Sequence, residues 1–285
     1  NYNGFKISGI HARPVGKVSG LDDIRQYAAL ADRDKVKPGG GRSEARDLWP
    51  AYREHVHRFL DPGLLDGTRT ITVAVDASNG MAGAMIPRVF GDVPGLKIIE
   101  INFEHAKGEF VHEPNPLVEA NLEQVREAVR QERADLGICF DGDADRCMVV
   151  DEQAEIIGCD LTTAWLAQRF LKDNPGAAIV YDLRSSRSLP EIIDEAGGRG
   201  IRSRVGHVFM KQLMAEHDAI FGGELSGHFY FRDNFYADSG AIAFAVVVSA
   251  VASSNKRLST QIEPARRYVQ SGEINFRVEE KEEAL

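Results

Sequence analysis

Short apolar runs alternate with amphipathic stretches along most of the chain. This alternation predicts strands connected by helices, which favours mainly parallel sheets with crossover helices. The beginning of the chain differs, because a strand-like stretch at 1–9 is followed by a polar, glycine-rich loop at 32–47 that leads into a helix predicted over 45–60. We expect a domain boundary near Asp47.

The predicted elements after this boundary fall into two units with the same order. The first unit has predicted strands and helices at 70–78 (strand), 79–90 (helix), 96–103 (strand), 115–134 (helix), 135–141 (strand) and 147–153 (strand). The second follows a helix at 161–171 and has 177–183 (strand), 185–197 (helix), 200–206 (strand), 207–217 (helix), 219–225 (strand) and 226–231 (turn and strand). The shared β-α-β-α-β-β order indicates a structural duplication. The predicted fold class is therefore α/β, with two tandem, duplicated three-layer α/β/α domains and mixed, mainly parallel sheets.

Two segments indicate which helical faces are buried. In the helix predicted at 115–134, the apolar positions near helical spacing are Leu117, Ala120, Val125, Ala128 and Val129, which we expect to form one buried face. The low-polarity run at 241–254 is shorter than the roughly 20 residues needed to span a bilayer, so we interpret it as a buried core helix.

Composition narrows the functional class. With 285 residues, 43% hydrophobic and 27% charged, the chain has the composition of a globular protein of about two domains. The net charge of -9 and the lack of a Lys or Arg block argue against a nucleic-acid or membrane partner. Cys139, Cys147 and Cys159 are odd in number and lack C-x-x-C spacing, which disfavours a disulfide framework or a zinc site. We expect reduced thiols, a cytoplasmic location and no signal peptide.

Three carboxylates are crowded between two predicted strands, in the order Asp141, Asp143 and Asp145. The small residues between them let the backbone turn tightly and direct the side chains to one point, an arrangement that suits a hard divalent cation with oxygen ligands. Mg²⁺ in such a site would also recruit a phosphate or water. Arg146 follows directly and is either a bidentate phosphate donor beside the metal or the partner in a surface ion pair.

Other interpretations of this loop remain open. It could be a solvated acidic turn, or an EF-hand in which Asp141 as position one puts Glu152 at position twelve. The EF-hand pattern requires Gly at position six, where Arg146 stands, and helices on both sides. A phosphatase would also begin with D-x-D, but we find no downstream Lys and acidic pair to complete one.

A second polar loop follows the equivalent strand of the second unit. It places Glu224, Ser226 and His228 at alternate positions, so that all three can point the same way in an extended turn. A carboxylate and a hydroxyl suit vicinal sugar hydroxyls, and His suits proton transfer near pH 7. Taken alone, a turn of this kind is more often merely structural. His207, at the predicted start of a helix, suits an anion or acts as a cap. If the units superpose, the two loops face a common cleft.

Four stretches in register resemble the α-D-phosphohexomutase family, the phosphomannomutase and phosphoglucomutase enzymes. They are FDGDADR (metal-binding loop), GELSGH (sugar-recognition loop), VGH (phosphosugar contact) and NYNGFK (after the active-site serine loop). The resemblance implies four domains around one cleft, in which a phosphoserine gives its phosphoryl group to a phosphosugar. The bisphosphate reorients and returns its other phosphoryl group, so hexose 1-phosphate and 6-phosphate interconvert. For this chain it implies mannose or glucose phosphates as substrates and Mg²⁺ as cofactor.

The same resemblance implies a role for individual residues. Those implied to bind Mg²⁺ are Asp141, Asp143 and Asp145; those implied in catalysis are Lys6, Arg146 and His228; and those implied to contact substrate are Arg184, His207, Glu224 and Ser226. Lys6 and His228 are candidates for proton transfer or charge stabilisation. Arg184 stands where some members have Lys.

The family pattern also sets the expected domain limits and departures. We expect a domain 1 remnant at 1–46, domain 2 at 47–158, domain 3 at 159–268 and a linker with the start of domain 4 at 269–285. The serine loop and the fourth domain are expected to be missing, which predicts an inactive chain. Ala144 replaces the usual Gly, a change that is tolerated unless the loop needs positive φ there. The alternative function is a non-catalytic Ca²⁺-binding or scaffold α/β module.

Overall fold

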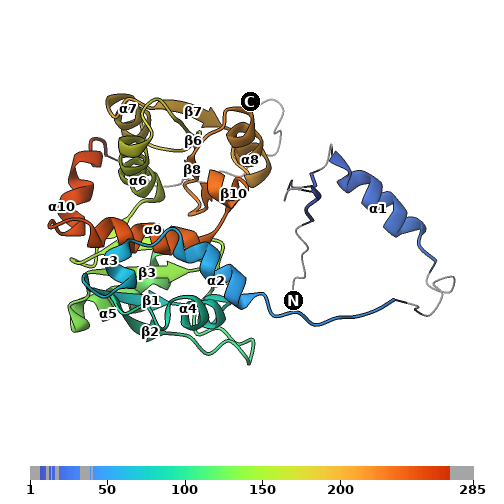
Figure 1. Ribbon diagram of the computed structural model, residues 1–285, viewed down its shortest axis with the longest axis horizontal. Coiled ribbons are helices and arrows are strands. Elements are labelled where there is room, and N and C mark those ends of the chain that lie inside the picture. The colour runs from blue at the N-terminus through green and yellow to red at the C-terminus, as the bar shows by residue number, and fades with distance from the viewer. Residues whose placement is uncertain are drawn as a thin grey trace.

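The computed structural model describes residues 7–10, 13, 15–16, 19–32, 39 and 41–269. Within these residues the chain forms two five-stranded sheets, each with three adjacent parallel strands on one side and antiparallel pairing on the other. Figure 1 shows the two units that contain these sheets. The predicted fold class is confirmed. Lys6 and nearly all of the predicted linker at 269–285 lie outside the described residues.

The first sheet has the order β2-β1-β3-β4-β5, and its strands are β1 (Ile71–Asp76), β2 (Leu96–Ile101), β3 (Leu136–Phe140), β4 (Cys147–Asp151) and β5 (Ile156–Ile157). β1 pairs in parallel with β2 and β3, whereas β4 is antiparallel to β3 and β5. The helices between the parallel strands are α4 (Ala82–Phe90), η4 (Glu119–Leu122) and α5 (Glu123–Glu132). Every residue of β3 and β4 is buried, because both faces of this part of the sheet are covered.

The second sheet repeats this arrangement strand for strand, in the order β7-β6-β8-β9-β10. Its strands are β6 (Ala178–Asp182), β7 (Arg199–Ser203), β8 (Phe221–Gly223), β9 (Phe229–Phe231) and β10 (Ala237–Asp238). The connecting helices are α7 (Ser188–Glu195), α8 (His207–Glu216) and the short η5 (Arg232–Asn234). The two-residue strands β5 and β10 were not predicted, because so short a stretch carries no hydrophobic period.

Each sheet is also covered by a helix that follows the other sheet in the chain. α6 (Cys159–Asp173) comes after β5 but packs mainly on α7 and β8, and α9 (Gly240–Ala252) comes after β10 but packs on β1 and β4. Figure 1 shows α9 between the two sheets. The ring of Phe244 in α9 lies 4.6 Å from that of Phe90 and 6.2 Å from that of Phe140. One hydrophobic core therefore extends through both units.

The remaining described helices do not connect strands within either sheet. They are α1 (Leu21–Leu30), α2 (Trp49–His57), α3 (Pro62–Leu65), α10 (Leu258–Ile262) and η6 (Glu263–Ala265). α2 and α3 both contact α9, so they add to the cover of the first sheet.

The helix predicted at 115–134 starts later than expected. It begins as η4 and continues as α5, because Pro114 and Pro116 hold the preceding residues in extended backbone. The prediction that Leu117 and Ala120 are buried was wrong, since both are exposed. The buried face consists of Leu122, Val125 and Val129.

Three further expectations agree with the structure. The apolar run at 241–254 is α9, and nearly all of its residues are buried. All three cysteines are buried and unpaired. Among the described residues, no helix is both long and apolar enough to cross a bilayer.

The shared core predicts that both sheets unfold together. Phe244→Ala should lower the free energy of unfolding by about 3–5 kcal/mol, because it removes a fully buried ring from the contact between α9 and the first sheet. Guanidinium unfolding followed by the fluorescence of Trp49 and Trp165 should give one shifted transition, and Phe110→Ala, at a half-exposed ring, should change it little. Two separate transitions would contradict a common core.

Candidate active site

The acidic loop, residues 141–146, connects β3 to β4 at the carboxyl end of β3. Asp141 is buried, and Arg146 closes the loop over it, because its Nε lies 2.7 Å from Oδ2 and its backbone N–H donates to Oδ1 at 3.1 Å. The ion pair considered for Arg146 is therefore present, and it is partly buried.

The three carboxylates of this loop converge. Asp141, Asp143 and Asp145 each offer an oxygen atom, and these oxygens lie within 4.8 Å of one another. Burial and the charge of Asp145 raise the pKa of Asp141 to about 6, although Arg146 acts in the opposite direction. The loop thus carries more negative charge than its arginine offsets, and an all-carboxylate donor set fits a hard divalent cation such as Mg²⁺.

The EF-hand interpretation of this loop is wrong. The loop joins two antiparallel strands, paired from Leu136 with Asp151 to Phe140 with Cys147, rather than two helices. Glu152 follows the opposite end of β4, where its carboxylate accepts hydrogen bonds from the backbone N–H and the hydroxyl of Ser259 at 3.1 and 2.5 Å. It cannot supply the twelfth-position ligand.

The second loop, residues 224–228, connects β8 to β9 as a tight turn rather than an extended one. Gly227 has a φ of 92° and donates its N–H to the Glu224 carbonyl at 3.0 Å. The turn brings Ser226 Oγ within 2.9 Å and Glu224 Oε2 within 3.7 Å of Nδ1 of His228. The three polar side chains therefore do converge, with the imidazole at their centre.

Glu224 is held by two donors that the sequence did not reveal. Its Oε1 accepts a hydrogen bond from the backbone N–H of Gly206 at 2.9 Å, and its Oε2 accepts one from the hydroxyl of Tyr230 at 2.5 Å. Burial and the charge of Glu224 raise the pKa of Tyr230 far above its usual value, so the hydroxyl keeps its proton. In the sequence, Tyr230 is one aromatic residue of an apolar strand and carries no separate signal.

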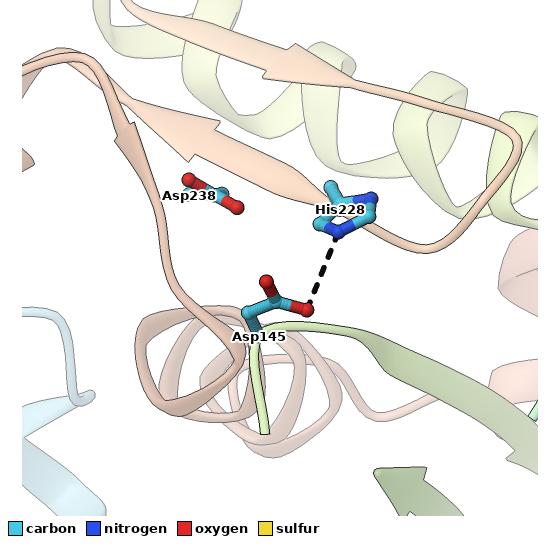
Figure 2. Close-up of side chains that lie close together, drawn as sticks. All are labelled: Asp145, His228 and Asp238. Carbon is cyan, nitrogen blue, oxygen red and sulfur yellow. Dashed lines mark ion pairs between the residues drawn. The ribbon is translucent and has the colours of Figure 1, made fainter. Parts of the chain in front are cut away.

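The two loops are joined by their backbones. Arg146 and His228 form an isolated antiparallel bridge, and the N–H of Cys147 donates to the Gly227 carbonyl at 3.0 Å. Figure 2 shows Asp145 from the first loop facing His228 from the second, with Oδ1 and Nε2 3.3 Å apart. The carboxylates of the acidic loop and the polar side chains of the second loop therefore lie in one place.

The charge of His228 follows from these neighbours. Burial lowers the pKa of its imidazole, but the hydrogen bond and ion pair with Asp145, together with the charges of Asp238 and Glu224, outweigh burial and leave it above the usual value. Asp238 in turn is held by Lys211 of α8, with Nζ and Oδ1 2.8 Å apart. The imidazole is thus biased toward its cationic form.

The other predicted substrate residues lie around the second loop. The guanidinium of Arg184, after β6, contacts Oδ2 of Asp182 at 2.7 and 3.2 Å, and the same oxygen accepts the N–H of Leu225 at 2.9 Å. Asp182 was missed, although it occupies the end of the first strand of its unit as Asp76 does in the other. His207 is exposed at the first position of α8.

The departure at Ala144 has a structural consequence. Its φ is 62°, in the left-handed region that favours glycine. Its carbonyl oxygen faces the start of α9 so closely that a Cβ on Gly240 would lie 2.4 Å away. On the other side, the N–H of Met81 donates to the Gly142 carbonyl at 3.0 Å. The loop therefore does need a positive φ at this position, so alanine in place of the family's usual glycine should cost stability.

Known proteins match this chain in sequence and in fold. The family models for phosphoglucomutase/phosphomannomutase α/β/α domains II and III match residues 51–155 and 159–268. The chain is 35% identical to a phosphomannomutase of Escherichia coli over its whole length and 63% of that protein, and 35% identical to one of Methanocaldococcus jannaschii over 98% of the chain and 61% of that protein. A crystal structure of a phosphoglucomutase/phosphomannomutase family protein from Burkholderia thailandensis superposes with a TM-score of 0.75 at 30% identity, covering 84% of this chain and 51% of that one.

The chain belongs to the α-D-phosphohexomutase family. It spans about 63% of the length of the E. coli relative.

The backbone of the acidic loop predicts a stabilising substitution. Ala144→Gly should raise the free energy of unfolding by about 0.5–1 kcal/mol, because relief of left-handed strain exceeds the entropy that glycine gains in the unfolded chain. Urea unfolding measures the change. Ala128→Gly in α5 is the matched control and should instead destabilise by about 1 kcal/mol. A loss of stability in Ala144→Gly would show that the methyl group makes contacts worth more than the strain.

Proposed function

We propose that this chain forms the metal-binding and sugar-binding centre of a phosphohexomutase that interconverts the 1- and 6-phosphates of mannose or glucose. The observation that carries the proposal is the junction of the two loops through Cys147 N–H, Gly227 carbonyl and the Asp145–His228 ion pair. A cation site and a sugar site that share a backbone bridge suit one substrate that carries both phosphate and hydroxyl groups.

In this proposal Asp141, Asp143 and Asp145 hold Mg²⁺. Their convergence within 4.8 Å supports a bound cation, because a divalent ion offsets their mutual repulsion, and it would also compensate the burial and the Asp145 charge that raise the pKa of Asp141. When bound, the ion stabilises charge on a transferring phosphoryl group. Arg146 keeps Asp141 in place and presents its remaining N–H groups beside the loop, where they can donate to phosphate oxygens.

The second loop would bind the sugar. Glu224 and Ser226 accept from and donate to vicinal hydroxyls, while Arg184 and His207 contact the phosphate that is not being transferred. His228, biased toward its cationic form by Asp145, donates a proton or stabilises charge at the reacting oxygen. Lys6 is a second candidate for this role.

The phosphoryl donor in the proposed reaction is a phosphoserine. Its phosphoryl group passes to a hydroxyl of the hexose phosphate, which loses its proton, and the bisphosphorylated sugar then reorients. Transfer of the other phosphoryl group back to the serine releases the isomeric monophosphate, so no external acceptor is consumed. Since the chain matches only part of its relatives, we propose that the 285 residues alone bind substrate without turning it over.

The test compares the protein expressed from its complete reading frame with the 285-residue chain. With Mg²⁺, the former should convert mannose 1-phosphate or glucose 1-phosphate to the 6-phosphate, followed by ³¹P NMR, and EDTA should abolish the conversion. The latter should bind these sugars in calorimetry without converting them. If the protein expressed from the complete reading frame converts no hexose phosphate, the proposed phosphohexomutase function is refuted.

Asp143→Asn, made in the protein expressed from the complete reading frame, tests the cation site. It should reduce kcat by about 10²-fold or more while leaving the circular dichroism spectrum unchanged, because it removes an exposed carboxylate of the cation site and no core contact. Asp194→Asn, an exposed position on α7, should leave kcat unchanged. Calorimetry with both ions completes the test, since micromolar affinity for Ca²⁺ with none for Mg²⁺ would favour a Ca²⁺-binding module instead.

A further inference from the structure

The ring of Tyr230 lies beneath α8, in the second hydrophobic cluster of the described residues. Its fully buried neighbours in that cluster are Ala178, Val180, Met210, Met214 and Ala219. The two methionines belong to α8, so the ring is fixed against the helix that begins at His207. This packing leaves the hydroxyl with one direction, toward the carboxylate of Glu224 at 2.5 Å.

Glu224 connects that hydroxyl to the start of the same helix. Its second oxygen accepts the N–H of Gly206, the residue before α8, at 2.9 Å. Gly206 has a φ of 123°, a backbone conformation that other residues rarely adopt, so the N–H is aimed by a turn that only glycine forms readily. Each oxygen of a side chain with only 3% of its surface exposed thus accepts one hydrogen bond from the protein, and each keeps a second lone pair for a ligand hydroxyl.

We propose that Tyr230 is a positioning residue. By fixing Glu224 against Gly206, Tyr230 sets the distance between His207, at the start of α8, and the side chains of Ser226 and His228 in the second loop. The inference rests on the proposed function, since it assigns Tyr230 to the placement of phosphosugar contacts. Without the hydroxyl, the buried Oε2 loses its hydrogen bond and keeps only the His228 imidazole 3.7 Å away, which favours rotation of Glu224 away from Gly206.

The rest of α8 does not depend on this connection. Lys211, one turn after His207, is held by Asp238 at 2.8 Å, and Met210 and Met214 remain packed on the ring when only the hydroxyl is removed. Tyr230→Phe should therefore loosen the first turn of α8 and leave the helix folded. Tyr236→Phe is the matched control, because its hydroxyl also bonds a carboxylate, that of Asp218 at 2.9 Å, outside both loops.

The first measurement is the hydrogen-exchange rate of the Gly206 amide in the 285-residue chain, followed by NMR. In Tyr230→Phe this amide should exchange about tenfold faster, the factor expected for loss of a hydrogen bond to a charged group. In Tyr236→Phe its rate should not change. Unchanged protection of Gly206 in Tyr230→Phe would overturn the proposal.

The second measurement is the affinity for mannose 1-phosphate and glucose 1-phosphate. Tyr230→Phe should weaken binding about three- to tenfold, and adding Glu224→Gln should then have less than its separate effect, because both substitutions break the same connection. Unchanged affinity, or fully additive losses, would overturn a role through Glu224. If the unsubstituted chain binds neither sugar phosphate, the proposed function is wrong. The hydrogen-exchange rate of the Gly206 amide still decides, in that case, whether Tyr230 fixes the start of α8.

Discussion

The hydrogen bond from Cys147 N–H to the Gly227 carbonyl joins two loops that belong to different sheets. It can form only because the sheets are held in one relative position, and the exchange of α6 and α9 between them provides that position. The start of α9 also abuts the acidic loop at Ala144. The shared core and the site are therefore consequences of one packing arrangement.

Charge is distributed unevenly across this junction. The three carboxylates of the first loop share that loop with one cation, Arg146, while His228 of the second loop pairs with Asp145, and Lys211 of α8 pairs with Asp238 of β10. Burial, and after it the charge of Asp145, raise the pKa of Asp141, so a ligand that neutralises this carboxylate is favoured there. This distribution favours a cation on the first loop.

Much of this arrangement could be predicted from local pattern. Both loops were predictable because polar residues follow buried strands in two units of equal order. The exchange of α9 was not, because its low-polarity run shows burial without showing which sheet covers it. The close approach of Gly240 to the carbonyl of Ala144, and the hydrogen bonds that Glu224 accepts from Gly206 and Tyr230, join residues that are far apart in the sequence, so local pattern could not predict them. The prediction that Leu117 is buried was wrong because Pro114 and Pro116 delay the start of the helix.

The central claim is that the cation site and the second loop form one centre. Mn²⁺, which accepts the same oxygen ligands as Mg²⁺, tests it directly through paramagnetic broadening of backbone amides in the NMR spectrum. The structure predicts that substoichiometric Mn²⁺ broadens the amides of Gly227 and His228 while those of Glu152 and Ser259, at the opposite end of β4, stay sharp. Sharp signals from Gly227 and His228, with broadening confined to the first loop or absent from it, would contradict a shared centre.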